Sequence, residues 1–164
     1  MEVVRVSLLD LAVALTVGLL FGGALGLFGG DGDGLTPAAI LPDPATTPGV
    51  LNPEVTQATI RSTICVKGWT STVRPPSSYT SELKRRMMDE LGRAGTMSDY
   101  QLDHFISLRL GGHPTDPRNL WPRQYPHHPE ANRQSQELHR KVCTEELSLR
   151  DAQHREAALK HNYG

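Results

Sequence analysis

The feature that most constrains this chain is an uncharged apolar run near its N-terminus. Leu11 to Phe28 reads LAVALTVGLLFGGALGLF, 18 residues without a charge. As a helix, this run would extend roughly 27 Å, close to the hydrocarbon thickness of a bilayer. It is apolar on all sides and rich in glycine, which disfavours a helix in a soluble core. We therefore expect residues 1–28 to form a transmembrane or signal helix.

Charges on the two sides of this run predict its orientation. Arg5 precedes it, and Asp31 and Asp33 follow it. The positive-inside rule then places the N-terminus in the cytoplasm and the rest of the chain outside. The segment is either cleaved, which gives a secreted protein, or kept as a single-pass anchor in the membrane. Because no small-x-small cleavage site follows Phe28 closely, we favour the anchor.

The remainder divides into a linker and a domain. Residues 29–56 are dominated by Gly and Pro without apolar periodicity, so we expect an extended spacer. Residues 1–56 contain one base and six acids, which leaves 16 bases, 12 acids and all seven His for residues 57–164. The expected domain, 57–164, therefore carries a net charge of +4, which suits a polyanionic partner.

The two cysteines, Cys65 and Cys143, bear on the compartment. They do not form a C-x-x-C pair, which excludes a four-thiolate zinc site. They are either two buried thiols or one disulfide, and export favours the disulfide. Such a bond would close a long loop and stabilise the domain by about 4 kcal/mol.

Periodicity and turn residues predict the elements of the domain. Residues 59–68 fit either a short strand or the end of a helix, and residues 68–80 read as a loop. The clearest expectations are a helix over 81–95, a strand over 102–110, a turn-rich loop over 111–118, a strand over 119–123, a helix over 130–140 and a closing helix from Ser148. These elements predict an α+β fold.

The main candidate functional residues are the adjacent Asp103 and His104. Hydrolysis of a phosphodiester needs a base that deprotonates water and a cation that neutralises charge at the phosphate. His104 titrates near neutral pH and can act as the base. Asp103 offers a hard oxygen to a divalent ion, and Asn132 offers a second ligand. The side-chain oxygen of Asn119 can accept from the imidazole N–H.

Beside Asn119, Arg118 is the best candidate for holding a phosphate of the nucleic acid. Arg118 can also be a turn residue that pairs with Asp116. Trp121 is expected in the core, behind the second strand.

The stretch LDHFISLRLGG followed by DPRNLWP and a helix resembles the ββα-metal fold of HNH nucleases. The chain is also similar to a group of small exported bacterial HNH-like proteins. The matching segments are Cys65 to Thr70, Asp103 to Gly112, Asn119 to Pro122, Val142-Cys143 and Ala152-Gln153. The resemblance implies a general base at His104, a metal ligand at Asp103, an orienting residue at Asn119 and a further metal position at Asn132.

The chain departs from the family in two segments. The family usually has Pro where this chain has Ser107, and often Lys-Asp where this chain has Ala131-Asn132. The resemblance implies an endonuclease that acts outside the cytoplasm on nucleic acid, with DNA favoured over RNA. It also implies one divalent ion, Mg²⁺ before Mn²⁺ or Zn²⁺, and no small-molecule cofactor. The alternative is a catalytically silent exported domain that serves as a binding or structural module.

Overall fold

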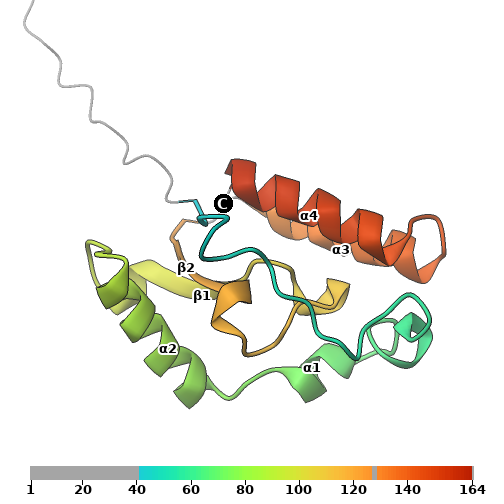
Figure 1. Ribbon diagram of the computed structural model, residues 1–164, viewed down its shortest axis with the longest axis horizontal. Coiled ribbons are helices and arrows are strands. Elements are labelled where there is room, and N and C mark those ends of the chain that lie inside the picture. The colour runs from blue at the N-terminus through green and yellow to red at the C-terminus, as the bar shows by residue number, and fades with distance from the viewer. Residues whose placement is uncertain (1–40, 127–128, 164) are drawn as a thin grey trace, which may run out of the picture. The chain divides into compact units, whose positions relative to one another are not determined.

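A computed structural model describes residues 41–126 and 129–163 (Figure 1). In this part of the chain, two helices precede a small two-stranded sheet and two follow it, which confirms the α+β class. The helices are α1 (Trp69–Val73), α2 (Ser77–Glu90), α3 (Pro129–Cys143) and α4 (Leu149–Tyr163). The strands are β1 (Tyr100–His104) and β2 (Leu120–Gln124), and the 3-10 turns are η1 (Ile60–Ser62), η2 (Met97–Asp99), η3 (Leu108–Leu110) and η4 (Pro117–Asn119).

The two strands form an antiparallel pair that presents the Asp103-His104 dipeptide. Asp103 lies opposite Trp121 and His104 lies opposite Leu120 in the register. Pro122 falls within β2, where a two-stranded sheet leaves one edge without a ladder partner and so tolerates its missing N–H. Trp121 is 1% exposed, which confirms its predicted place in the core.

Helices cover the sheet from different directions (Figure 1). The long helices α3 and α4 pack side by side and both contact η3, whereas α2 contacts both strands. The central cluster of buried apolar residues comprises Val55, Ile60, Ile64, Phe105, Ile106, Leu110, Trp121, Leu138, Val142, Leu149 and Ala152. The core thus draws on α3, α4 and the segments around the sheet.

The first strand is shorter than predicted. It ends at His104, and Phe105, Ile106, Leu108 and Leu110 are all buried in the turn that follows. Buried Ile106, Leu108 and Leu110 alternate with the partly exposed Ser107 and Arg109, as they would in a half-buried strand, but Leu108–Leu110 form the 3-10 turn η3.

The N-terminal part of the domain also differs from expectation. The short helix α1 lies in the predicted loop 68–80, and residues 59–68 form the 3-10 turn η1 and further turns, neither a strand nor the end of an α-helix. The helix predicted over 81–95 is α2, which starts earlier, directly after the Pro75-Pro76 pair.

The predicted spacer 29–56 overlaps the folded domain in its described part. Asn52 donates a backbone hydrogen bond to Gly111 at 2.8 Å, and His113 donates one to Val50 at 2.8 Å. Val55 is 5% exposed and belongs to the core. The folded domain therefore begins before residue 57.

The helix predicted within residues 1–28 lies outside the described residues. Every helix of the described residues is too short or too polar to span a bilayer.

A disulfide joins Cys65 to Cys143, as predicted. It connects the segment after η1 to the last residue of α3, across 78 positions of the sequence. By restricting the unfolded chain, a cross-link of this span stabilises the native state.

Replacing both cysteines by alanine should lower the free energy of unfolding by about 4 kcal/mol, because the unfolded chain regains the entropy of a long open loop. Urea denaturation followed by circular dichroism measures this loss. Wild type treated with dithiothreitol should lose a similar amount, while the double variant should not respond to the reductant. A double variant as stable as the oxidised wild type would contradict this account.

Candidate functional site

His104 ends β1 and is largely buried, at 8% exposure. Its Nε2 lies 3.0 Å from the carbonyl oxygen of Pro114. A carbonyl only accepts hydrogen bonds, so this contact assigns the proton to Nε2 and leaves the lone pair on Nδ1. The neutral imidazole is thereby fixed in the tautomer that a general base requires.

Burial lowers the pKa of His104 below its ordinary value. The positive charges of Arg74 and Lys160 lower this pKa further, whereas the bond to Pro114 and the charge of Asp103 oppose the shift. The net direction favours the neutral ring at neutral pH, which can accept a proton from water.

Asn119 holds the loop between the strands and does not bond the imidazole. Its side chain is fully buried, and its oxygen accepts from the Ile106 N–H at 2.8 Å. Its Nδ2 donates to the carbonyls of Ile106 and His113, both at 3.0 Å. The contact predicted between Asn119 and His104 is replaced by an indirect one. Asn119 fixes His113, and the next residue, Pro114, supplies the carbonyl that holds His104.

Gly111 and Gly112 shape the loop that the Asn119 side chain holds. Gly111 has a φ of +79°, a left-handed conformation that favours glycine. A Cβ on Gly112 would lie 1.7 Å from the Ile106 carbonyl oxygen and 2.6 Å from Asn119 Nδ2. Gly112 is therefore required by the close approach of the backbone to the buried amide, and Gly111 by its left-handed conformation.

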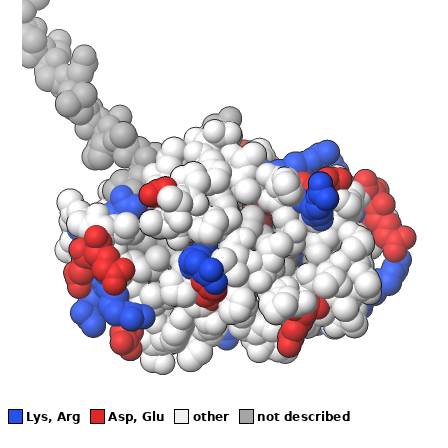
Figure 2. All heavy atoms as spheres, viewed as in Figure 1, with Lys and Arg blue, Asp and Glu red and all other residues white. Residues whose placement is uncertain are grey.

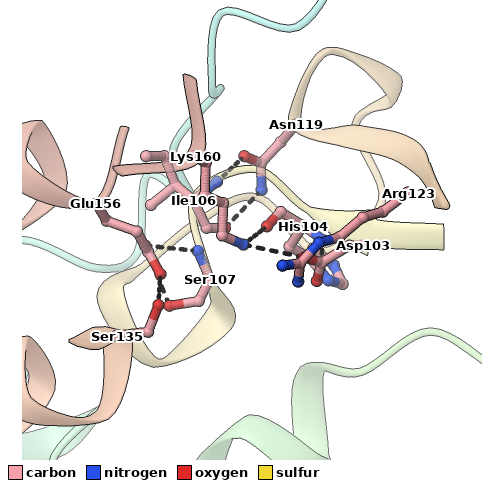
Figure 3. A network of polar contacts seen from close by, with 9 residues as sticks. All are labelled: Asp103, His104, Ile106, Ser107, Asn119, Arg123, Ser135, Glu156 and Lys160. Atoms are coloured by element: carbon pink, nitrogen blue, oxygen red, sulfur yellow. Dashed lines mark hydrogen bonds and ion pairs between the residues drawn. The ribbon is translucent and has the colours of Figure 1, made fainter. Parts of the chain in front are cut away.

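Asp103 is the acidic residue next to His104 (Figure 3). Its Oδ1 accepts from the backbone N–H of His104 at 2.9 Å, and its Oδ2 lies 3.2 Å from Lys160 Nζ and 3.4 Å from an Arg123 guanidinium nitrogen. Burial alone would raise the pKa of Asp103, but the charges of Lys160 and Arg123 outweigh it and hold the pKa below its ordinary value. Asp103 is thus a carboxylate at neutral pH.

Glu156 ties α4 to the segment after β1. Its fully buried carboxylate accepts from the N–H and hydroxyl of Ser107 at 2.9 and 3.2 Å, and from the hydroxyl of Ser135 on α3 (Figure 3). Proline, which the resembled family has at position 107, lacks both donors. Ser107 and Glu156 are therefore a matched pair in this chain.

A cavity of about 290 Å³ opens beside Asp103 and His104. Asn132, which is exposed on α3, lines the same cavity, so the structure brings together three of the residues predicted from the sequence. The charged residues that line this cavity are Arg74, Arg109, Lys160 and Asp103. Three cations against one carboxylate favour an anionic ligand.

A second cavity, of about 410 Å³, extends from the same place toward α2. It shares Arg74, Gln101, Leu102 and His104 with the first cavity and continues along Ser77, Thr80 and Ser81 of α2. His104 therefore lies where two hollows meet, a position suited to the middle of an elongated ligand.

Arg118 lies apart from these cavity walls. Its exposed side chain forms a two-pronged ion pair with Asp116, with contacts of 2.7 and 3.0 Å. Asp116 also accepts from the Arg118 backbone N–H, at the start of η4. The structure therefore shows the turn pairing, while a role in binding nucleic acid stays a prediction.

The outer surface carries mixed charge. On the face shown in Figure 2, basic and acidic side chains lie beside one another in small groups. A broad basic patch does not cover this face of the described residues. The excess of positive charge that an anion would meet is found in the cavity next to His104.

Sequence reasoning missed the residues of α4 that reach the site. The buried positions of this helix are Leu149, Ala152, Gln153, Glu156 and Lys160. They recur at helical spacing, so the inner face changes from apolar to polar toward its C-terminal end. That change was visible in the sequence, as charged residues at positions that continue an apolar stripe.

His139 lies beside the disulfide. Its Nε2 is 3.5 Å from Cys143 Sγ and 2.9 Å from the carbonyl of Ile64. The nitrogen and the two sulfurs lie within 4.8 Å of one another, a grouping that resembles a set of metal ligands. Because the sulfurs are bonded to each other, neither is a thiolate, which is the form that binds metal.

Comparisons with protein-family models, with curated proteins and with solved structures yield no match.

Asn119→Ala should lower the free energy of unfolding by about 3 kcal/mol or more, since it leaves buried backbone groups without partners. Urea denaturation provides the measurement. The neighbouring Arg118→Ala is the control, and its effect should stay within about 0.5 kcal/mol because its pair with Asp116 is exposed. Equal effects of the two substitutions would show that the amide does not hold the loop.

Proposed function

We propose that this domain is a nuclease that hydrolyses phosphodiester bonds at the cavity beside His104. One observation carries the proposal. The Pro114 carbonyl holds Nε2 of His104 and leaves Nδ1 as an acceptor, next to a cavity whose charged lining is mostly basic. A neutral base beside clustered cations suits attack by water on a phosphate, which needs both.

The proposed reaction uses the residues of the chain as follows. Nδ1 of His104 takes a proton from a water molecule, whose oxygen attacks the phosphorus. The bond to the leaving oxygen breaks, and that oxygen keeps the electron pair and is protonated by solvent. Arg109 and Lys160, both in the cavity wall, stabilise the negative charge on the phosphate oxygens.

The divalent ion predicted between Asp103 and Asn132 has a poor set of donors here. Asp103 is the one carboxylate among the described residues that line the cavity, and its Oδ2 already faces Lys160 and Arg123. Asn132 is neutral and exposed. We therefore assign no step to a metal ion.

The disulfide supports action outside the cytoplasm. Such bonds persist in oxidising compartments and are rare in the cytosol. The Cys65–Cys143 bond agrees with the proposal that residues 1–28 export or anchor the chain, so the substrate would be extracellular or periplasmic nucleic acid. Double-stranded DNA remains the first substrate to test, and RNA the second.

The second candidate is a catalytically silent binding module, which the basic side chains of the same cavity also favour. If His104 does not take a proton from water, the cavity can still bind a phosphate through Arg74, Arg109 and Lys160 without promoting its hydrolysis. Binding of nucleic acid without any cleavage would select this alternative.

Cleavage by the full chain should be seen as nicking of supercoiled plasmid, and His104→Ala should reduce it by about 100-fold or more, as expected on loss of a general base. Wild-type activity should fall on acidification only below pH 6.5, the ordinary pKa of His, because burial lowers the pKa of His104 and keeps the ring neutral above that value. His154→Ala, at an exposed position on α4, is the matched control and should retain full activity.

Equal nicking by wild type and His104→Ala would mean that His104 is not the base. The absence of nicking, and of single-stranded RNA cleavage, with Mg²⁺, with Mn²⁺, with Zn²⁺ and with EDTA would reject the nuclease proposal.

A further inference from the structure

The position next to His104 at which a metal was expected is held by two basic side chains. Lys160 Nζ and an Arg123 nitrogen lie 3.2 and 3.4 Å from the same oxygen of Asp103. Both basic side chains are only 4% exposed, so water screens their charges poorly. The carboxylate is thus surrounded by positive charge on its Oδ2 side.

A divalent cation is disfavoured at Oδ2 of Asp103, and Oδ1 already accepts from the His104 N–H. A Mg²⁺ ion would sit roughly 2 Å from Oδ2 and would therefore lie close to both basic groups. Like charges at such separations repel strongly in a buried setting. The other buried acid nearby, Glu156, is engaged by Ser107 and Ser135 and cannot serve as a compensating ligand without breaking those bonds.

Lys160 is placed to supply positive charge next to a bound phosphate. Its ammonium donates to Asp103 Oδ2 and to the backbone carbonyl of His104, and its side chain lines the cavity. An ammonium has three donors, so these two contacts leave one for a phosphate oxygen in the cavity. The contact with the His104 carbonyl also holds the Lys160 ammonium next to His104.

We propose that Lys160 supplies the positive charge at the phosphate in place of a divalent metal, so that cleavage proceeds in the absence of metal. This inference rests on the proposed nuclease function. Asp103 acts in it as a positioning residue, which holds Lys160 and Arg123 by ion pairs. Lys160 is a catalytic residue, because it touches the reacting phosphate.

The test compares plasmid nicking by the full chain in EDTA and in Mg²⁺. We expect similar rates in the two conditions. We also expect that Lys160→Met lowers the rate in EDTA by about 100-fold, the usual loss when a donor to a developing anion is removed. Lys160→Arg keeps the charge and should retain much more activity. Lys67→Met, at an exposed position, should behave as wild type.

Nicking that requires Mg²⁺, Mn²⁺ or Zn²⁺ and disappears in EDTA would overturn this inference while supporting the nuclease proposal. Cleavage absent under every condition would instead reject the nuclease, and the inference with it.

Mn²⁺ binding provides an independent readout that requires no cleavage and no buried substitution at Lys160. In electron paramagnetic resonance titrations of the full wild-type chain, we expect no saturable Mn²⁺ binding that depends on Asp103. Saturable binding that Asp103→Asn abolishes would overturn the inference, even if Lys160→Met fails to fold.

Discussion

The buried amide of Asn119 is the contact on which the rest of the site depends. It satisfies both backbone groups of Ile106 and the carbonyl of His113, and so holds the two ends of the loop segment together. With the segment held in this way, the Pro114 carbonyl points at His104 and leaves its Nδ1 as the acceptor. The small sheet presents His104, and a buried hydrogen-bond network selects the tautomer of its ring.

A second constraint comes from the C-terminal helix. Glu156 and Lys160 lie one turn apart on the inner face of α4, where a small domain would ordinarily place apolar residues. Glu156 fastens the segment after β1 and Lys160 reaches Asp103, so one helix face connects the core to the cavity. Because buried charges are costly unless they are paired, both contacts are expected to be specific.

The sequence predicted the order of strand, loop, strand, loop and helix, because Gly, Pro and apolar spacing are local signals. The disulfide was predicted from the expected export of the chain. The sequence also singled out Asp103, His104 and Asn132, which share one cavity. It assigned Asn119 to the wrong partner, since the path of a loop depends on contacts that spacing alone does not determine. Lys160 lies 57 positions from Asp103, and only packing brings the two together.

Chemical rescue tests the central claim, that His104 is the base, most directly. His104→Gly in the full chain removes the imidazole, and free imidazole is then added during plasmid cleavage. The account predicts that the variant is inactive alone and that imidazole restores part of the activity, more at a pH where the added base is neutral. A variant that cleaves as fast as wild type without imidazole would contradict the account.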